Sequence, residues 1–178
     1  FYALATLLTA CVDMPPKRSL PQGPAARGGM SAMRLDTGRF DLVSMLRVRG
    51  DAGILRIYIE GDGRAFATRN RPSRDPTPNQ PVAYHLALVD PSPAVAYLSR
   101  PCHYGFTRNC RQRDWTTGRY SAAVIASMDR AVSHLKQKTR VAQIELAGYS
   151  GGAAVAALVA ARRVDVAGLI TIAGNLDH

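Results

Sequence analysis

The stretch that decides the fold is VAQIELAGYSGGAAVAALVAARR, residues 141–163. Its first residues, Val141 to Ala147, are mostly apolar and predict a buried strand, and the alanine-rich run from Gly151 to Arg163 predicts a helix. Between them lies Gly148-Tyr149-Ser150-Gly151-Gly152. A tight strand-to-helix turn lifts a serine hydroxyl clear of the backbone, and it needs glycine where a Cβ would strike the neighbouring chain. Ser150 is therefore the candidate nucleophile.

Further strands and helices alternate before and after this stretch. Strands are expected at 40–48, 54–59, 94–98 and 166–173, and helices at 82–89 and after the N-cap Ser121. The second helix carries an apolar stripe at helical spacing, formed by Val124, Ile125, Met128, Ala131, Val132 and Leu135. The last strand is almost continuously apolar, which is typical of a parallel strand buried on both faces. This order predicts an α/β fold with a mainly parallel sheet and helices on both faces.

The Gly-x-Ser-x-Gly turn, with an apolar strand before it and a helix of small residues after it, resembles the α/β-hydrolase superfamily. The resemblance is closer to secreted or lipid-anchored bacterial members, and it covers about residues 39–178. It implies a serine hydrolase in which Ser150 attacks an ester, thioester or amide and forms an acyl-enzyme. A peptidase rather than an esterase, or a lipid-anchored binding protein that kept the fold without the activity, are the alternatives.

The same resemblance implies an oxyanion hole made of two backbone N–H groups. One belongs to the residue after the nucleophile, Gly151, and the other to the loop that follows the strand at 54–59. By position, the second donor is Asp62, because the glycines on either side of it let the backbone turn its amides inward. A plain turn is the alternative interpretation of Gly61-Asp62-Gly63.

The acid and the base of a triad follow the serine in this family, in the order Ser, Asp, His. Asp177 lies just past the last predicted strand and is a possible acid, whereas Asp165 precedes that strand, at the opposite edge of the sheet. His178 is adjacent to Asp177 and cannot orient independently toward Ser150. The other histidines precede the serine, the wrong order for this family: His85, His103 and His134. We therefore expect the base beyond residue 178, with the C-terminal part of the fold missing, and an inactive fragment.

The composition limits the other function classes. With 178 residues, of which 47% are hydrophobic, the chain can bury the core of one domain. Lys and Arg outnumber Asp and Glu by 23 to 13, a net charge of +10, so a polyanionic partner must be considered. The arginines gather at 64–74 and 100–119, but neither stretch has the aromatic stacking pattern of a single-strand binder. We interpret them as a solvated basic surface, and expect a small-molecule or acyl substrate and no nucleic acid.

The first eleven residues carry no charge and end in Leu8-Thr9-Ala10-Cys11. This ending resembles a bacterial lipobox, and it predicts that Cys11 is lipidated, that residues 1–11 are a partial signal peptide, and that the protein is exported and anchored in the bacterial cell envelope. An ordinary signal peptide with a chance cysteine, or a buried N-terminal strand, are the alternatives. Residues 12–38 are rich in Pro, Gly, Ser and Ala, and predict a flexible tether before a domain at 39–178.

The remaining cysteines, Cys102 and Cys110, are separated by seven residues. In an exported protein this spacing favours a disulfide that closes a short loop. A zinc site is less favoured, because no second Cys/His pair with ligand spacing exists and His103 alone does not supply one. We expect no cofactor and no metal.

Overall fold

A computed structural model describes residues 28–105, 109–174 and 176 of the chain. Within these residues, a six-stranded sheet in the order β1-β2-β6-β3-β7-β8 carries helices on both faces, and a separate two-stranded hairpin joins β4 to β5. The elements are, in chain order, β1 Ser31–Asp36, β2 Asp41–Val48, β3 Ile54–Ile59, β4 Phe66–Thr68, β5 Arg71–Pro72, α2 Val82–Val89, β6 Ala94–Leu98, the 3₁₀ turn η1 Gln112–Trp115, α3 Ala122–Thr139, β7 Gln143–Tyr149, α4 Gly151–Ala160 and β8 Val166–Ile172.

The sheet is mainly parallel, as predicted. Strands β6, β3, β7 and β8 run parallel, whereas β2 pairs antiparallel with β6, and β1 pairs antiparallel with β2. Each parallel connection passes through a helix: α2 joins β3 to β6, α3 joins β6 to β7, and α4 joins β7 to β8. The carboxyl ends of β3 and β7 therefore meet at one edge of the sheet, in the middle of the strand order.

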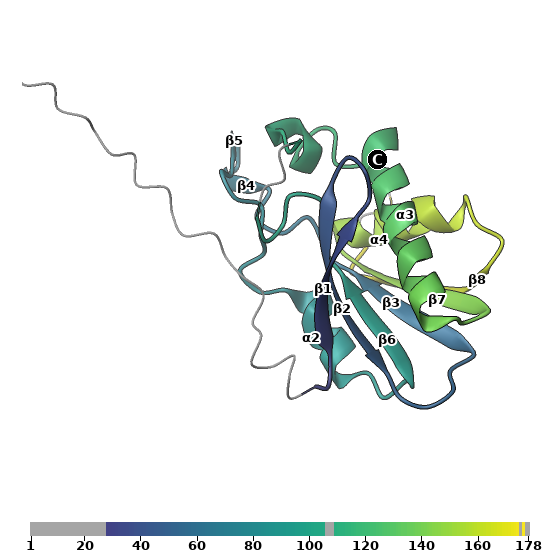
Figure 1. Ribbon diagram of the computed structural model, residues 1–178. Helices are drawn as coiled ribbons and strands as arrows, with labels where there is room; N and C mark the ends of the chain where they lie inside the picture. The colour runs from purple at the N-terminus through teal and green to yellow at the C-terminus, as the bar shows by residue number, and fades with distance from the viewer. Residues whose placement is uncertain (1–27, 106–108, 175, 177–178) are drawn as a thin grey trace, which may run out of the picture.

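Strand β6 separates two apolar cores. Ala94, Ala96 and Leu98 belong to the core that contains α3 and α4, whereas Val95 and Tyr97 belong to the core beside α2. All five side chains are buried, because successive residues of a strand point to opposite faces of the sheet. Figure 1 shows α3 and α4 together on one side of the sheet and α2 on the other. The apolar stripe predicted for α3 is buried along its whole length.

The tether predicted for residues 12–38 is wrong for its last part. Residues Ser31–Asp36 form β1, which pairs along its whole length with β2, and Met30 and Leu35 are buried. Gly38, at φ +83°, closes the hairpin, and its N–H donates to the Asp36 carboxylate over 2.7 Å. An edge strand needs few apolar residues, because most of its side chains are exposed while its backbone pairs with one neighbour. Its pairing partner therefore decides its structure, and the composition of the segment does not. Residues 12–27 lie outside the described part.

Strand β8 departs from its predicted burial. The apolar run was expected to be covered on both faces, but Leu169 and Ile170 are 44% and 41% exposed. Strand β8 lies at the edge of the described sheet, where α4 is the helix that packs against it. One helix at an edge cannot cover both faces of a strand. Its parallel pairing with β7 follows the prediction.

The predicted disulfide between Cys102 and Cys110 is present, with the two Cα atoms 5.8 Å apart. Cys102 is buried and belongs to the core that contains α3 and α4. The bridge fixes the start of the segment that leads from β6 to α3. Among the helices that the structure describes, none is long and apolar enough to cross a lipid bilayer. Cys11, the predicted lipidation site, lies outside the described residues.

Candidate active site

Ser150 lies between the end of β7 and the start of α4. Its backbone has φ +50° and ψ −124°, a conformation that L-residues rarely adopt. Two hydrogen bonds hold it there. The Ser150 N–H donates to the Ile172 carbonyl over 2.9 Å, and the Ser150 carbonyl accepts from the Ala153 N–H over 2.9 Å. A strained residue held in place by its surroundings at a strand-to-helix turn is the geometry that the sequence motif predicts.

The flanking glycines are sterically required, as predicted. A Cβ on Gly148 would lie 2.4 Å from the Ala153 Cα and 2.4 Å from the Gly152 carbonyl oxygen. A Cβ on Gly152 would lie 2.5 Å from the carbonyl oxygens of both Ile59 and Glu60, at the end of β3. Both distances are far below a van der Waals contact, and all the atoms struck are backbone. The turn can therefore form only with glycine at these two positions.

The loop after β3 lies directly against this turn. A Cβ on Gly61 would be 3.3 Å from the Ser150 Cβ, and a Cβ on Gly151 would be 2.3 Å from the Asp62 carboxylate. The structure thus brings Asp62 and Gly151, the two residues predicted to supply the oxyanion hole, to the same place beside Ser150. That the N–H groups of these two residues stabilise an oxyanion stays a prediction.

The Asp62 carboxylate is held by two arginines that sequence reasoning did not connect to it. Arg100 Nη1 lies 3.1 Å from one carboxylate oxygen, and Arg119 Nε lies 3.2 Å from the other. Burial lowers the pKa of Arg100, and the charge of Asp62 opposes that shift. Both guanidinium groups also lie over the Tyr120 ring, 5.6 Å and 4.7 Å from its centroid. The sequence features that could have indicated these ion pairs are the acidic loop after the strand at 54–59 and the basic stretch at 100–119.

Glu60 holds the other end of the loop from inside the protein. It is 1% exposed, and its Oε1 accepts hydrogen bonds from the N–H groups of Gly61, over 3.0 Å, and Ala83, over 3.5 Å. Ala83 belongs to the first turn of α2, where the helix dipole favours a negative charge. Burial nevertheless raises the pKa of Glu60, and these backbone hydrogen bonds oppose the shift. Behind it, burial raises the pKa of Tyr97, whose hydroxyl bonds to that of Tyr104 over 3.1 Å.

Ser150 opens into a cavity of about 360 Å³ between the turn and this loop. We call it the Ser150 cavity. The loop after β3 forms one wall, residues 78–80 form another, and the turn forms the third. The lining residues are Glu60, Gly61, Asp62, Gly63, Arg64, Phe66, Pro78, Asn79, Gln80, Tyr149 and Ser150. Its size suits a small molecule or the acyl end of a larger one.

The described histidines do not supply a base. His103 is buried below the loop, where its ring hydrogen-bonds the Asp62 backbone, and burial followed by the charge of Arg100 lowers its pKa to about 3. His85 and His134 are exposed on α2 and α3. None of the three hydrogen-bonds the Ser150 hydroxyl, in agreement with the chain-order argument. His103 therefore supports the loop after β3. Asp177, the predicted acid, and its neighbour His178 lie outside the described residues.

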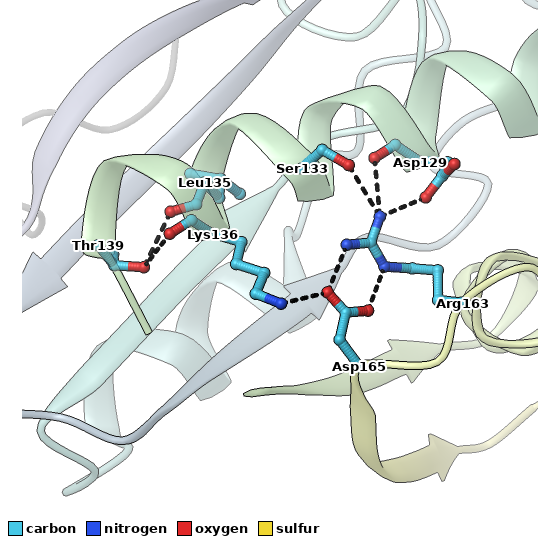
Figure 2. Close-up of polar contacts among 7 residues, drawn as sticks. All are labelled: Asp129, Ser133, Leu135, Lys136, Thr139, Arg163 and Asp165. Carbon is cyan, nitrogen blue, oxygen red and sulfur yellow. Dashed lines mark hydrogen bonds and ion pairs between the residues drawn. The ribbon is translucent and has the colours of Figure 1, made fainter. Parts of the chain in front are cut away.

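Asp165 is remote from Ser150, as its place before β8 predicted. Figure 2 shows its carboxylate between Lys136, at 2.5 Å, and Arg163, at 2.8 Å. Arg163 also donates to Asp129 and Ser133 on α3. These cations hold the pKa of Asp165 well below its ordinary value, with Arg163 the largest cause. The network ties α3 to the α4–β8 connection and has a structural role.

The comparisons agree with this architecture. The sequence matches no family model and no curated protein. Solved structures similar to the chain include a protein of unknown function from Agrobacterium tumefaciens that is described as a putative alpha/beta hydrolase (14% identity, TM-score 0.59, 81% of this chain and 60% of that one). Another is an alpha-beta serine hydrolase homologue from Coxiella burnetii (16% identity, TM-score 0.53, 75% of this chain and 58% of that one). A third is a proline iminopeptidase-related protein from Thermus thermophilus (15% identity, TM-score 0.54, 82% of this chain and 45% of that one).

The chain thus spans about 60% or less of the length of these three proteins. At such identities the likeness concerns the path of the backbone. It agrees with the mainly parallel sheet and the helices on both faces. The chain therefore has the fold of the α/β hydrolases.

Proposed function

We propose that this chain carries the nucleophile of a serine hydrolase, and that Ser150 attacks the carbonyl carbon of an ester, thioester or amide. The observation that carries the proposal is the conformation of Ser150. A residue at φ +50°, between glycines that admit no Cβ and at the wall of a cavity, is a costly arrangement for a surface turn. Such strain is retained where the exposed hydroxyl is used.

The proposed reaction is acyl transfer through an acyl-enzyme. The Ser150 Oγ forms a bond to the carbonyl carbon while its proton passes to a general base, and the carbonyl oxygen becomes an oxyanion. The N–H groups of Gly151 and Asp62 donate to that oxyanion. Its collapse breaks the bond to the alcohol, thiol or amine, which leaves with a proton, and water then releases the acid by the same steps. Asp177 is the proposed acid that orients the base.

The arginines around Asp62 make this reaction electrostatically reasonable. An unpaired carboxylate beside Gly151 would oppose the negative charge of an oxyanion. Arg100 and Arg119 neutralise it, and they also fix the loop that carries the Asp62 N–H. An acidic loop at this place is the feature that favours the second candidate, a binding protein without hydrolytic activity.

Labelling with a fluorophosphonate separates the two candidates. The full-length protein should be labelled on Ser150, and the Ser150→Ala variant should not be labelled although its circular dichroism is unchanged. Folded wild-type protein that stays unlabelled would exclude the hydrolase and leave the binding protein. An ester and an anilide of the same acyl group then separate an esterase from a peptidase, and we expect faster turnover of the ester.

We also propose that the protein is exported and attached to a membrane through a lipid on Cys11. The disulfide between Cys102 and Cys110 supports an oxidising compartment. In cells that express the full-length protein, Cys11→Ser should move it from the membrane fraction to the soluble fraction. Unchanged fractionation would contradict the lipid anchor, whereas Ser150 labelling is independent of it.

A further inference from the structure

A second cavity adjoins the Ser150 cavity. It has a volume of about 490 Å³ and is lined by the β4–β5 hairpin, by the turn that follows it and by Gln112. We call it the basic cavity, because three arginines line it: Arg64, Arg71 and Arg74. Arg64 also lines the Ser150 cavity, so the two cavities share a wall.

The three arginines differ from the other arginines near the site in having no acidic partner. Within residues 28–105, 109–174 and 176, no carboxylate lies within ion-pair distance of Arg64, Arg71 or Arg74, whereas Arg100 and Arg119 both pair with Asp62. The one carboxylate of the basic cavity, Asp75, accepts from the Thr77 N–H over 2.9 Å. The cavity thus combines three positive charges with one negative charge at a concave surface, which concentrates a positive potential.

Hydrogen bonds within residues 64–76 hold the backbone that carries these arginines. The Arg64 N–H donates to the Pro76 carbonyl over 2.8 Å, and the Ser73 N–H donates to the Ala65 carbonyl over 2.9 Å. The Ser73 hydroxyl donates to the Asp75 carbonyl over 2.7 Å. Residues 64–76 therefore form a folded wall, and their arginines emerge from fixed positions, as a binding site for a small ligand requires.

We propose that the basic cavity binds an anionic group, a phosphate or a carboxylate, of the acyl substrate whose scissile bond lies at Ser150. This inference rests on the proposed function and names its substrate class. A guanidinium group donates two parallel hydrogen bonds to either anion, and Arg64 lies where such a group would pass from one cavity into the other. The volume also lies in the range of small-molecule sites, whereas a nucleic acid needs an extended basic surface.

Matched esters measured on the full-length protein test this inference. One pair compares p-nitrophenyl butyrate with mono-p-nitrophenyl glutarate, which carries a carboxylate on the acyl side. The other compares 1-butyrylglycerol with 1-butyrylglycerol 3-phosphate, which carries a phosphate on the alcohol side. We expect kcat/KM to be higher for the anionic member of at least one pair. The double variant Arg71→Gln/Arg74→Gln should lower that preference roughly tenfold, and kcat/KM for the neutral ester should not change.

The matched control is Arg69→Gln, an exposed arginine of the same hairpin that does not line the cavity. It should leave the preference intact. Equal turnover of both members of both pairs, or an equal loss in the control, would overturn the inference while the hydrolase stands. If Ser150 is neither labelled nor active, the proposed function fails. Binding of inorganic phosphate then tests whether the basic cavity is an anion site. Saturable binding lost in the double variant supports the site, and its absence from the wild type overturns it.

Discussion

The two sides of the Ser150 cavity are held in place by different physical means. The turn at Ser150 is fixed by the absence of side chains: Gly148 and Gly152 let three backbone segments approach to distances that no Cβ allows. The loop from Glu60 to Arg64 is also held by polar side chains, through Asp62 with its two arginines and through Glu60 with the Ala83 N–H of α2. The turn should therefore tolerate changes of pH but no added atom, whereas the loop, in which a Cβ on Gly63 would also strike the Pro76 carbonyl oxygen, should in addition respond to pH.

The largest effect is expected from Gly148→Ala. The new Cβ would meet the Ala153 Cα and the Gly152 carbonyl at 2.4 Å, so the turn or α4 must move. We expect a loss of about 4 kcal/mol in the free energy of unfolding, together with loss of Ser150 labelling. Urea denaturation measures the first. Gly53→Ala is the control, because a Cβ there meets nothing within 4 Å and should change stability by about 0.5 kcal/mol or less.

The next largest effect is expected from Asp62→Asn. The change keeps the shape of the side chain but leaves Arg100, which is 4% exposed, as a buried charge without its partner. Breaking such a pair from one side costs about 3 kcal/mol. The same substitution at Asp51, which is exposed, controls for the loss of one negative charge. A result within error of that control would mean that the loop is held by its backbone alone.

The predictability of the two sides differs for the same physical reason. The turn is local: an apolar strand, five residues with three glycines and an alanine-rich helix stand together in the sequence, so period and glycine spacing suffice to predict it. The ion pair of Asp62 with Arg100 joins residues that lie 38 positions apart, in different connections of the sheet. Nothing in the pattern around Asp62 or Arg100 indicates that pair, because it exists only once β3 and β6 are neighbours.

The sheet repeats this lesson. The inner strands could be predicted, since strands buried on both faces carry apolar residues whatever their neighbours. The two edge strands of the described sheet were predicted only in part. The sequence of β1 is half polar and follows a Pro- and Gly-rich segment, and only its ladder with β2 makes it a strand. The apolar sequence of β8 predicted burial that its place in the described sheet does not provide.

A moderate effect is expected from acid on the support beneath the loop. His103 has a pKa of about 3 in the folded protein, against 6.5 ordinarily, because burial opposes its charge. Below pH 6.5 the unfolded chain therefore binds a proton that the folded chain does not, and stability falls with pH until about pH 3. The loss by pH 5 is about 2 kcal/mol. Unfolding curves of wild type and His103→Asn should show it as a steeper loss of stability between pH 6.5 and pH 5 in the wild type than in the variant.

The smallest effect at neutral pH, and the sharpest test of the contrast, is Glu60→Gln. The new amide side chain keeps an oxygen that accepts from the Gly61 and Ala83 N–H groups and removes a charge that burial disfavours, so the change at pH 7 should stay within about 1 kcal/mol. Because burial raises the pKa of Glu60, the folded protein holds a proton that the unfolded chain has lost above pH 4.5.

The stability contributed by protonated Glu60 is therefore complete below pH 4.5 and is lost as pH rises through the folded-state pKa, a trend opposite to that of His103. Relative to wild type, the Glu60→Gln variant should thus become more stable as pH increases. A variant that loses stability instead, by an amount growing with pH, would mean that the α2 dipole and the two amides favour the ionised carboxylate more than burial opposes it. In that case both carboxylates of the loop would act as charged anchors, and the electrostatic side of the cavity would be held more strongly than the buried position of Glu60 indicates.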